Sequence, residues 1–164
     1  MKSAFLASVT LALAGIGLAA CGQDSSEPTE PAAEVSPDAL PGIAVTGGRL
    51  VLPAVKGNPG AVYFEAANNG EKDTAIVGAF VDGAKEAMLH ASVEKDGVMS
   101  MNHMDQVPLA KGGTVSFAPG GNHVMVFELA DTLAVGGTTE VTLTFANGDK
   151  ASFNAEILGP GEAR

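Results

Sequence analysis

The sequence predicts an all-β fold, a Greek-key sandwich or small barrel. From Arg49 onward the chain is a series of short apolar runs separated by Gly, Pro and Asn. Within one run, Val141, Leu143 and Phe145 alternate with polar residues, which is the period of a half-buried strand. No stretch shows a long 3.6-residue period. About seven to nine short strands with turns at this spacing are typical of a sandwich or a small barrel.

The expected strands cover most of the chain from residue 49 onward. They lie at residues 49–55, 61–68, 74–81, 87–94, 98–103, 114–117, 123–129, 139–146 and 150–158. Between the last two, Asn147-Gly148 is a strong signal for a hairpin turn. About 115 residues are enough to bury a single core. We therefore expect one folded domain over residues 48–158, followed by a tail at 159–164.

The N-terminus has the pattern of an export signal. Lys2 supplies a positive charge, and residues 4–20 form an uncharged apolar stretch that ends in small residues. The segment Leu18-Ala19-Ala20-Cys21 resembles the lipobox of bacterial lipoproteins, in which the cysteine is diacylated and becomes the first mature residue. The alternative is a plain signal peptide cleaved near the same place. Gly22, rather than Asp, follows Cys21, and the resemblance therefore favours the outer membrane.

Residues 21–47 are expected to be a disordered tether between the lipidated Cys21 and the domain. The segment is rich in Pro, Ser, Ala and Glu, and it has no basic residue. Low hydrophobicity with charge of one sign does not bury enough apolar area to order a chain. As a flexible coil, ~26 residues reach roughly 25–30 Å. Such a tether would hold the domain away from the membrane.

Composition excludes several classes of function. The chain has a net charge of −10, with 9 Lys+Arg against 19 Asp+Glu, so it offers no basic stripe for nucleic acid. The single cysteine excludes an internal disulfide, a zinc–thiolate cluster and a CxxC redox pair. If that cysteine carries lipid, the domain also lacks the thiolate that a blue-copper site requires.

The histidines and methionines are concentrated in one part of the chain. Apart from the initiator Met1, all of them lie within residues 88–125, namely His90, His103, His123, Met88, Met99, Met101, Met104 and Met125. A hydrophobic core gives no reason for this, because Leu, Val and Phe fill that role elsewhere. Thioether sulfur is a soft donor that selects Cu(I), and imidazole also suits copper. Calcium and magnesium prefer oxygen ligands, and zinc sites use thiolate, imidazole and carboxylate rather than thioether.

Strand periodicity places pairs of these donors on common faces. His123 and Met125 are two residues apart on an expected strand, as are Met99 and Met101, so each pair leaves one face. We expect these pairs to converge with His90 at one end of the sandwich. Taken singly, each residue also has an ordinary structural explanation, as a hydrogen-bonded histidine of a sheet or as core packing. Their shared location favours binding.

The spacing of four of these donors resembles the signature of periplasmic copper chaperones of the PCu(A)C type. In that signature ten residues separate the first His from a Met, twenty-one residues separate this Met from a second His, and one residue separates the second His from a second Met. The four residues here are His90, Met101, His123 and Met125. The segments LHASVEKDGVMSM at 89–101 and VPLAKGGTVSFAPGGNHVMVFEL at 107–129 are also similar to the family. The resemblance covers roughly residues 45–158. It implies a cupredoxin-like, immunoglobulin-like β-sandwich in which these four residues bind Cu(I).

The resemblance also implies a function. Members of the family handle copper in the periplasm, and one recipient is the CuA centre of cytochrome c oxidase. The expected partner is therefore cytochrome c oxidase subunit II or another copper chaperone, and the expected activity is transfer without catalysis. The sequence departs from many members because Ala91 and Ser92 stand where a further Met often follows the first His. Met99, His103 and Met104 are additional candidate ligands that would enlarge the site or accept Cu(II).

Two other classes of function remain open at this point. A tethered immunoglobulin-like interaction module without metal would bind no stoichiometric copper. A copper oxidase or superoxide dismutase would need more histidines than the three present. The GxSxG and HExxH motifs of common hydrolases are absent. We expect copper-loaded protein to show no turnover above that of free copper.

Overall fold

The computed structural model describes residues 40–95 and 97–162, and this part of the chain forms ten strands without a helix. The expected export signal, Cys21 and most of the expected tether lie outside the described residues. No helix long and apolar enough to span a membrane occurs in the described ranges. The strands are β1 (Ile43–Val51), β2 (Gly60–Asn68), β3 (Thr74–Val81), β4 (Glu86–Lys95), β5 (Val98–His103), β6 (Val107–Leu109), β7 (Thr114–Phe117), β8 (Asn122–Phe127), β9 (Thr138–Phe145) and β10 (Lys150–Leu158).

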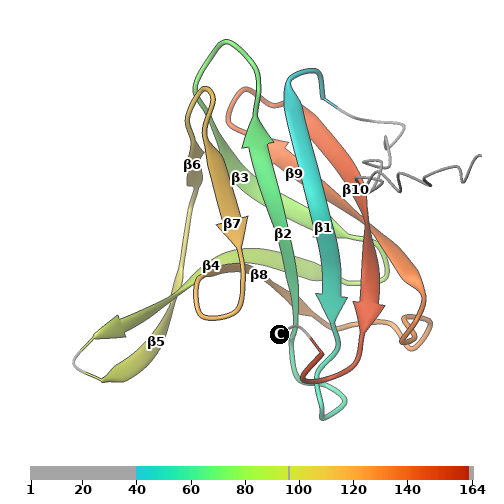
Figure 1. The fold of residues 1–164 in the computed structure, drawn as a ribbon. Coiled ribbons are helices and arrows are strands. Elements are labelled where there is room, and N and C mark those ends of the chain that lie inside the picture. The colour runs from blue at the N-terminus through green and yellow to red at the C-terminus, as the bar shows by residue number, and fades with distance from the viewer. Residues whose placement is uncertain (1–39, 96, 163–164) are drawn as a thin grey trace, which may run out of the picture. The chain divides into compact units, whose positions relative to one another are not determined.

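The ten strands form one continuous hydrogen-bonded sheet in the order β5-β4-β8-β7-β2-β1-β10-β9-β3-β6. Neighbouring strands are antiparallel except for the pairs β1–β10 and β7–β8. The sheet folds over itself, and β3 in one half packs beside β4 in the other (Figure 1). The all-β prediction is confirmed, with the two layers of the sandwich joined by hydrogen-bonded strands.

Alternate residues of the strands fill the space between the two layers. Val141, Leu143 and Phe145 of β9 are fully buried, as their alternation predicts. The rings of Phe64 and Phe117 stack with their centroids 4.2 Å apart. This core holds the strands rigidly, and the residues between the buried ones are left to face outward.

The first strand begins earlier than the sequence indicates. β1 starts at Ile43, inside the range expected for the tether, and pairs with β2 from that residue onward. A bulge between Thr46 and Arg49 interrupts this pairing, and Gly47 adopts a φ of +64° there. The two glycines at 47 and 48 interrupt the apolar alternation, which is why the pattern is legible only from Arg49 onward.

One strand was not expected, and one predicted turn is confirmed. β6 contains only three residues with Pro108 at its centre, a length and composition that carry no strand signal. It pairs with β3 at the end of the sheet. Between β9 and β10, Gly148 has a φ of +87° and its N–H donates to the carbonyl of Phe145. This closes the hairpin that Asn147-Gly148 predicts.

Candidate metal centre

The three histidines lie side by side on neighbouring strands. β4 runs between β5 and β8, and His90 of β4 is in register with His103 on one side and His123 on the other. Residues opposite each other on paired strands project from the same face, so the three imidazoles form a row. The ring centroids are 6.0 Å apart for His90 and His123, and 5.7 Å apart for His90 and His103.

Two methionines of the predicted set flank this row on the same face. Met125 follows His123 by two residues on β8, and Met101 precedes His103 by two residues on β5. Both are therefore diagonal neighbours of His90, at Cα separations of about 7–8 Å. They lie on opposite sides of the histidine row, and His90 is the residue that both can approach. We call the face that carries these five residues the donor face.

The donor face changes from buried to exposed across the three strands. On β8, His123 is only 6% exposed. On β5, an edge strand whose six residues are all exposed, Met101 is 62% exposed and Met99 is 55% exposed. The side chain of His103 is 56% exposed. On β8, His123 is thus shielded from solvent and Met125 is half-buried, whereas the donors on β5 are open to solvent.

The nitrogens of His90 have no partner among the described residues. Both Nδ1 and Nε2 are buried and make no hydrogen bond. Burial lowers the pKa of His90 below its ordinary value of 6.5, and the nearby His123 and His103 act in the same direction. The ring is therefore neutral at pH 7 and has a lone pair available. A buried polar atom without a partner is unfavourable, and a metal ion bound to a ring nitrogen would relieve that penalty.

His123 is oriented by its own strand. Its Nδ1 lies 3.0 Å from the carbonyl oxygen of Gly121, so this nitrogen carries the proton and donates to the backbone. The lone pair is then on Nε2, as in many metal sites where a backbone carbonyl fixes the tautomer of a ligating histidine. The turn before β8 therefore presents His123 to a metal ion in a defined orientation.

The predicted donors do not all come together. His90, His123 and Met125 are adjacent, Met101 and His103 approach from β5, and Met99 lies further along that strand toward the hairpin turn. Met104 packs against the hydrophobic core, away from the other donors. Among the described residues, no three His, Cys, Asp or Glu side chains are arranged to hold a metal ion together.

Two residues beside His123 were missed by the sequence analysis. The ring centroid of Tyr63 in β2 lies 6.5 Å from that of His123. The guanidinium carbon of Arg49 in β1 lies 5.6 Å from the Tyr63 ring centroid, and burial raises the pKa of Tyr63 although the Arg49 charge opposes this. Tyr63 thus lies beside His123, and the Arg49 guanidinium lies over the Tyr63 ring. No sequence motif connects these positions, because only the pairing of three strands brings them together.

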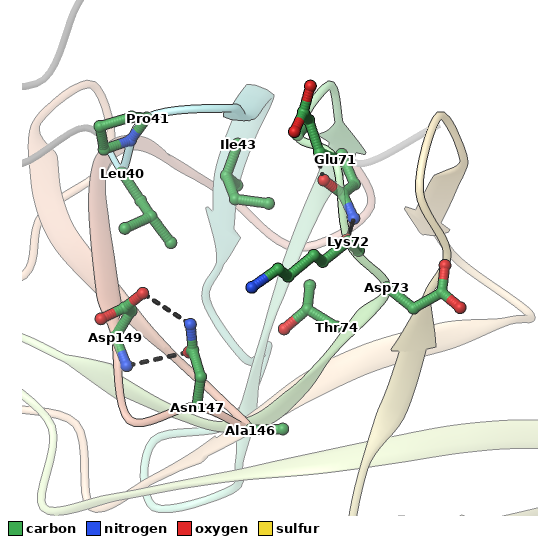
Figure 2. Close-up of a pocket in the computed structure, with 12 residues that line it drawn as sticks. Leu40, Pro41, Ile43, Glu71, Lys72, Asp73, Thr74, Ala146, Asn147 and Asp149 are labelled. Carbon is green, nitrogen blue, oxygen red and sulfur yellow. Dashed lines mark hydrogen bonds between the residues drawn. The ribbon is translucent and has the colours of Figure 1, made fainter.

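A pocket elsewhere in the domain has a different chemistry. It is lined in part by Leu40, Ile43 and Lys72, and Figure 2 shows the Lys72 ammonium group extending into it. It also includes Asn68, at the end of β2, whereas β8 pairs with the first residues of that strand. The pocket therefore lies away from the donor face. No histidine or methionine lines it, so it offers no soft metal ligand.

Comparison with known proteins places the domain in a family. The model of the family described as "Putative lipoprotein LpqE-like" matches residues 43–157. The chain belongs to the LpqE-like family. A family relative from Leifsonia xyli subsp. xyli, "Putative lipoprotein Lxx21020", is 33% identical over 89 residues, which are 54% of each chain. The present chain thus matches about half the length of that relative.

Solved structures of PCuAC domains have the same fold as this LpqE-like domain. The "Copper-bound PCuAC domain from PmoF2" superimposes with a TM-score of 0.62 at 20% identity, covering 74% of this chain and 97% of that chain. The solution structure of "CuI-DR1885" from Deinococcus radiodurans gives a TM-score of 0.60 at 25% identity, covering 81% and 89%. These likenesses confirm the cupredoxin-like β fold that the resemblance to PCu(A)C proteins implies.

Proposed function

We propose that this LpqE-like domain is a copper chaperone that binds Cu(I) on its donor face and passes it to a recipient protein. The proposed ligands are His90, Met101, His123 and Met125. The observation that supports this most directly is the environment of His90. In the described part of the chain its buried nitrogens lack a hydrogen-bond partner, while methionine side chains and a second imidazole lie beside it. Two proteins of similar structure have been solved with copper bound.

The distance between the two proposed imidazole ligands suits a single ion. Nitrogen–metal bonds of imidazole are about 2 Å long, and a ring centroid lies roughly another 1 Å behind the bonding nitrogen. Two rings bound to one ion thus have centroids up to roughly 6 Å apart. The separation of His90 and His123 is 6.0 Å. Met125 follows on the same strand face, and the flexible side chain of Met101 would close over the ion from β5.

Two imidazoles and two thioethers make a neutral, soft set of ligands that favours Cu(I). The set contains no thiol, which an oxidising compartment would convert to a disulfide or a sulfenic acid. A recipient that carries thiolates would bind Cu(I) more tightly and take it by stepwise ligand exchange. The CuA centre of cytochrome c oxidase subunit II and other copper chaperones are such recipients. In this role the domain transfers its cargo and catalyses no reaction.

The proposed location is the periplasm, with the protein anchored to a bacterial membrane through lipid on Cys21. The lipobox-like segment at residues 18–21 supports this, as does the word lipoprotein in the names of the family and of the Leifsonia relative. Gly22 favours the outer membrane. A tether before β1 would let the donor face reach partners away from the bilayer.

The test is an anaerobic competition for Cu(I) between the full chain in detergent and the chelator bicinchoninate. We expect one copper ion per chain, and X-ray absorption of the loaded protein should show nitrogen and sulfur neighbours in similar number. His123→Asn and Met125→Ala should each weaken binding at least tenfold. Met104→Leu, a change on the opposite side of the sheet, is the matched control. No stoichiometric copper, or the same affinity in all variants, would instead favour a tethered interaction module without metal.

A further inference from the structure

His90 has two imidazole neighbours, and among the described residues no three side chains of this kind are arranged to hold one ion. His103 and His123 lie on β5 and β8, which are separated by β4, so their strands are about 10 Å apart. The centroid distances of 6.0 and 5.7 Å nevertheless allow His90 to share an ion with either neighbour. The donor face therefore contains two alternative positions that have His90 in common.

The two positions differ in their access to solvent and to a partner. The position with His123 is at the buried side of the donor face, where Tyr63 lies beside the imidazole. The position with His103 is on an edge strand whose residues are all exposed. Figure 1 shows the β4–β5 hairpin projecting away from the body of the sandwich. The second position is therefore the more open of the two to a protein that approaches from outside.

We propose that His103 is the exit ligand of the chaperone, to which Cu(I) moves from His123 before it leaves the protein. This inference rests on the proposed copper function. His90 keeps hold of the ion during the move, and Met101, beside His103 on β5, is in reach of both positions. Met99 then supplies a further thioether on the exposed strand, closer to the hairpin turn.

The move is a ligand exchange in which charge and electrons are conserved. A bond forms between Cu(I) and a neutral nitrogen of His103, and the bond between Cu(I) and Nε2 of His123 breaks. No electron or proton is transferred, and the ion remains Cu(I).

A structural role explains His103 less well. The residue lies on an edge strand, its side chain is more than half exposed, and it is absent from the hydrophobic core. Its partners among the described residues are the edge of the His90 ring and the fully exposed Asp105. An imidazole at that position adds little to folding, and its value lies in the donor it presents beside His90.

The experiment separates the rate of transfer from the affinity. The full chain in detergent is loaded with Cu(I), and transfer to a synthetic peptide with two cysteines is followed by stopped flow. His103→Asn should leave the Cu(I) affinity in bicinchoninate competition within twofold of the wild type and slow transfer at least tenfold. Ser100→Asn, on the other face of β5, is the matched control and should change neither. In the loaded wild type, exchange broadening in NMR spectra should affect the ring protons of both His103 and His123.

The outcomes are distinct. An unchanged transfer rate in His103→Asn would overturn the exit role. A loss of affinity as large as that of His123→Asn would make His103 a resident ligand and would also overturn it. If the wild type takes up no copper from bicinchoninate, the proposed function itself fails and the exit role fails with it.

Discussion

Replacing His90 with leucine should stabilise the copper-free domain and abolish its binding of Cu(I). Both ring nitrogens of His90 are buried without a hydrogen bond. A buried polar atom without a partner costs about 1–3 kcal/mol, and leucine fills a similar volume without such atoms. Because the residue as a whole is only partly buried, we expect a gain at the lower end, about 1–2 kcal/mol in the free energy of unfolding. This corresponds to a rise in melting temperature of roughly 3–10 °C for a domain of this size.

The matched variant is His123→Leu. Its Nδ1 donates to the carbonyl of Gly121, so the substitution removes a satisfied hydrogen bond and should reduce stability by about 1 kcal/mol. Urea denaturation with a copper chelator present would measure both changes, and bicinchoninate competition would show that both variants lose Cu(I). If His90→Leu unfolds at a lower urea concentration than the wild type, the ring nitrogens of His90 in the wild type have hydrogen-bond partners in solution. The reasoning from unpaired atoms would then be wrong.

Three further predictions concern pH, the bulge and the opposite face of the sheet. Because burial lowers the pKa of His90, protons should compete with copper at this ring only below pH 6.5, and the Cu(I) affinity should fall as the pH decreases further; an affinity in chelator competition that stays constant down to the pH at which the domain unfolds would contradict ligation by His90. Gly48→Ala would place a Cβ 2.6 Å from the ring of Phe153, and we expect a loss of about 1–3 kcal/mol in urea denaturation with unchanged Cu(I) affinity. Met104→Ala should also lose about 1–3 kcal/mol, since Met104 packs against the core; a tenfold weaker affinity for copper in this variant would place it in the site instead.

The sequence predicts most of the strands because apolar alternation is local. β9 and β10 are legible from alternation and from the Asn147-Gly148 turn between them, and the structure agrees. The start of β1 is not legible, because a bulge with two glycines interrupts the alternation. β6 is not recognisable from the sequence, because it has only three residues and Pro108 is at its centre. Local patterns fail where a strand depends on a bulge or on a distant partner.

The candidate ligands could be selected from the sequence, but their arrangement could not. The spacing of the donors makes His90, His123 and Met125 candidate ligands without a structure. It does not reveal that β4 lies between β5 and β8, because that order depends on pairing between strands distant in sequence. The order of strands is what makes His90 the central imidazole. The expected strand at residues 98–103 ends one residue before Met104. If that strand were extended to residue 104, alternation would place Met104 on the face opposite to His103 and would exclude it from the donor set.

The donor face and the core use alternate residues of the same strands. On β8, Val124 and Val126 are fully buried in the core, and His123 and Met125 project from the other face. Substitutions on one face should therefore change the proposed metal binding while the other face preserves the fold. His90 is where the two requirements conflict, since we expect its unpaired nitrogens to lower the stability of the copper-free domain. Copper bound to His90 would satisfy a nitrogen that the fold leaves unpaired. The addition of Cu(I) should accordingly raise the melting temperature of the wild type by more than it raises the melting temperature of His90→Leu.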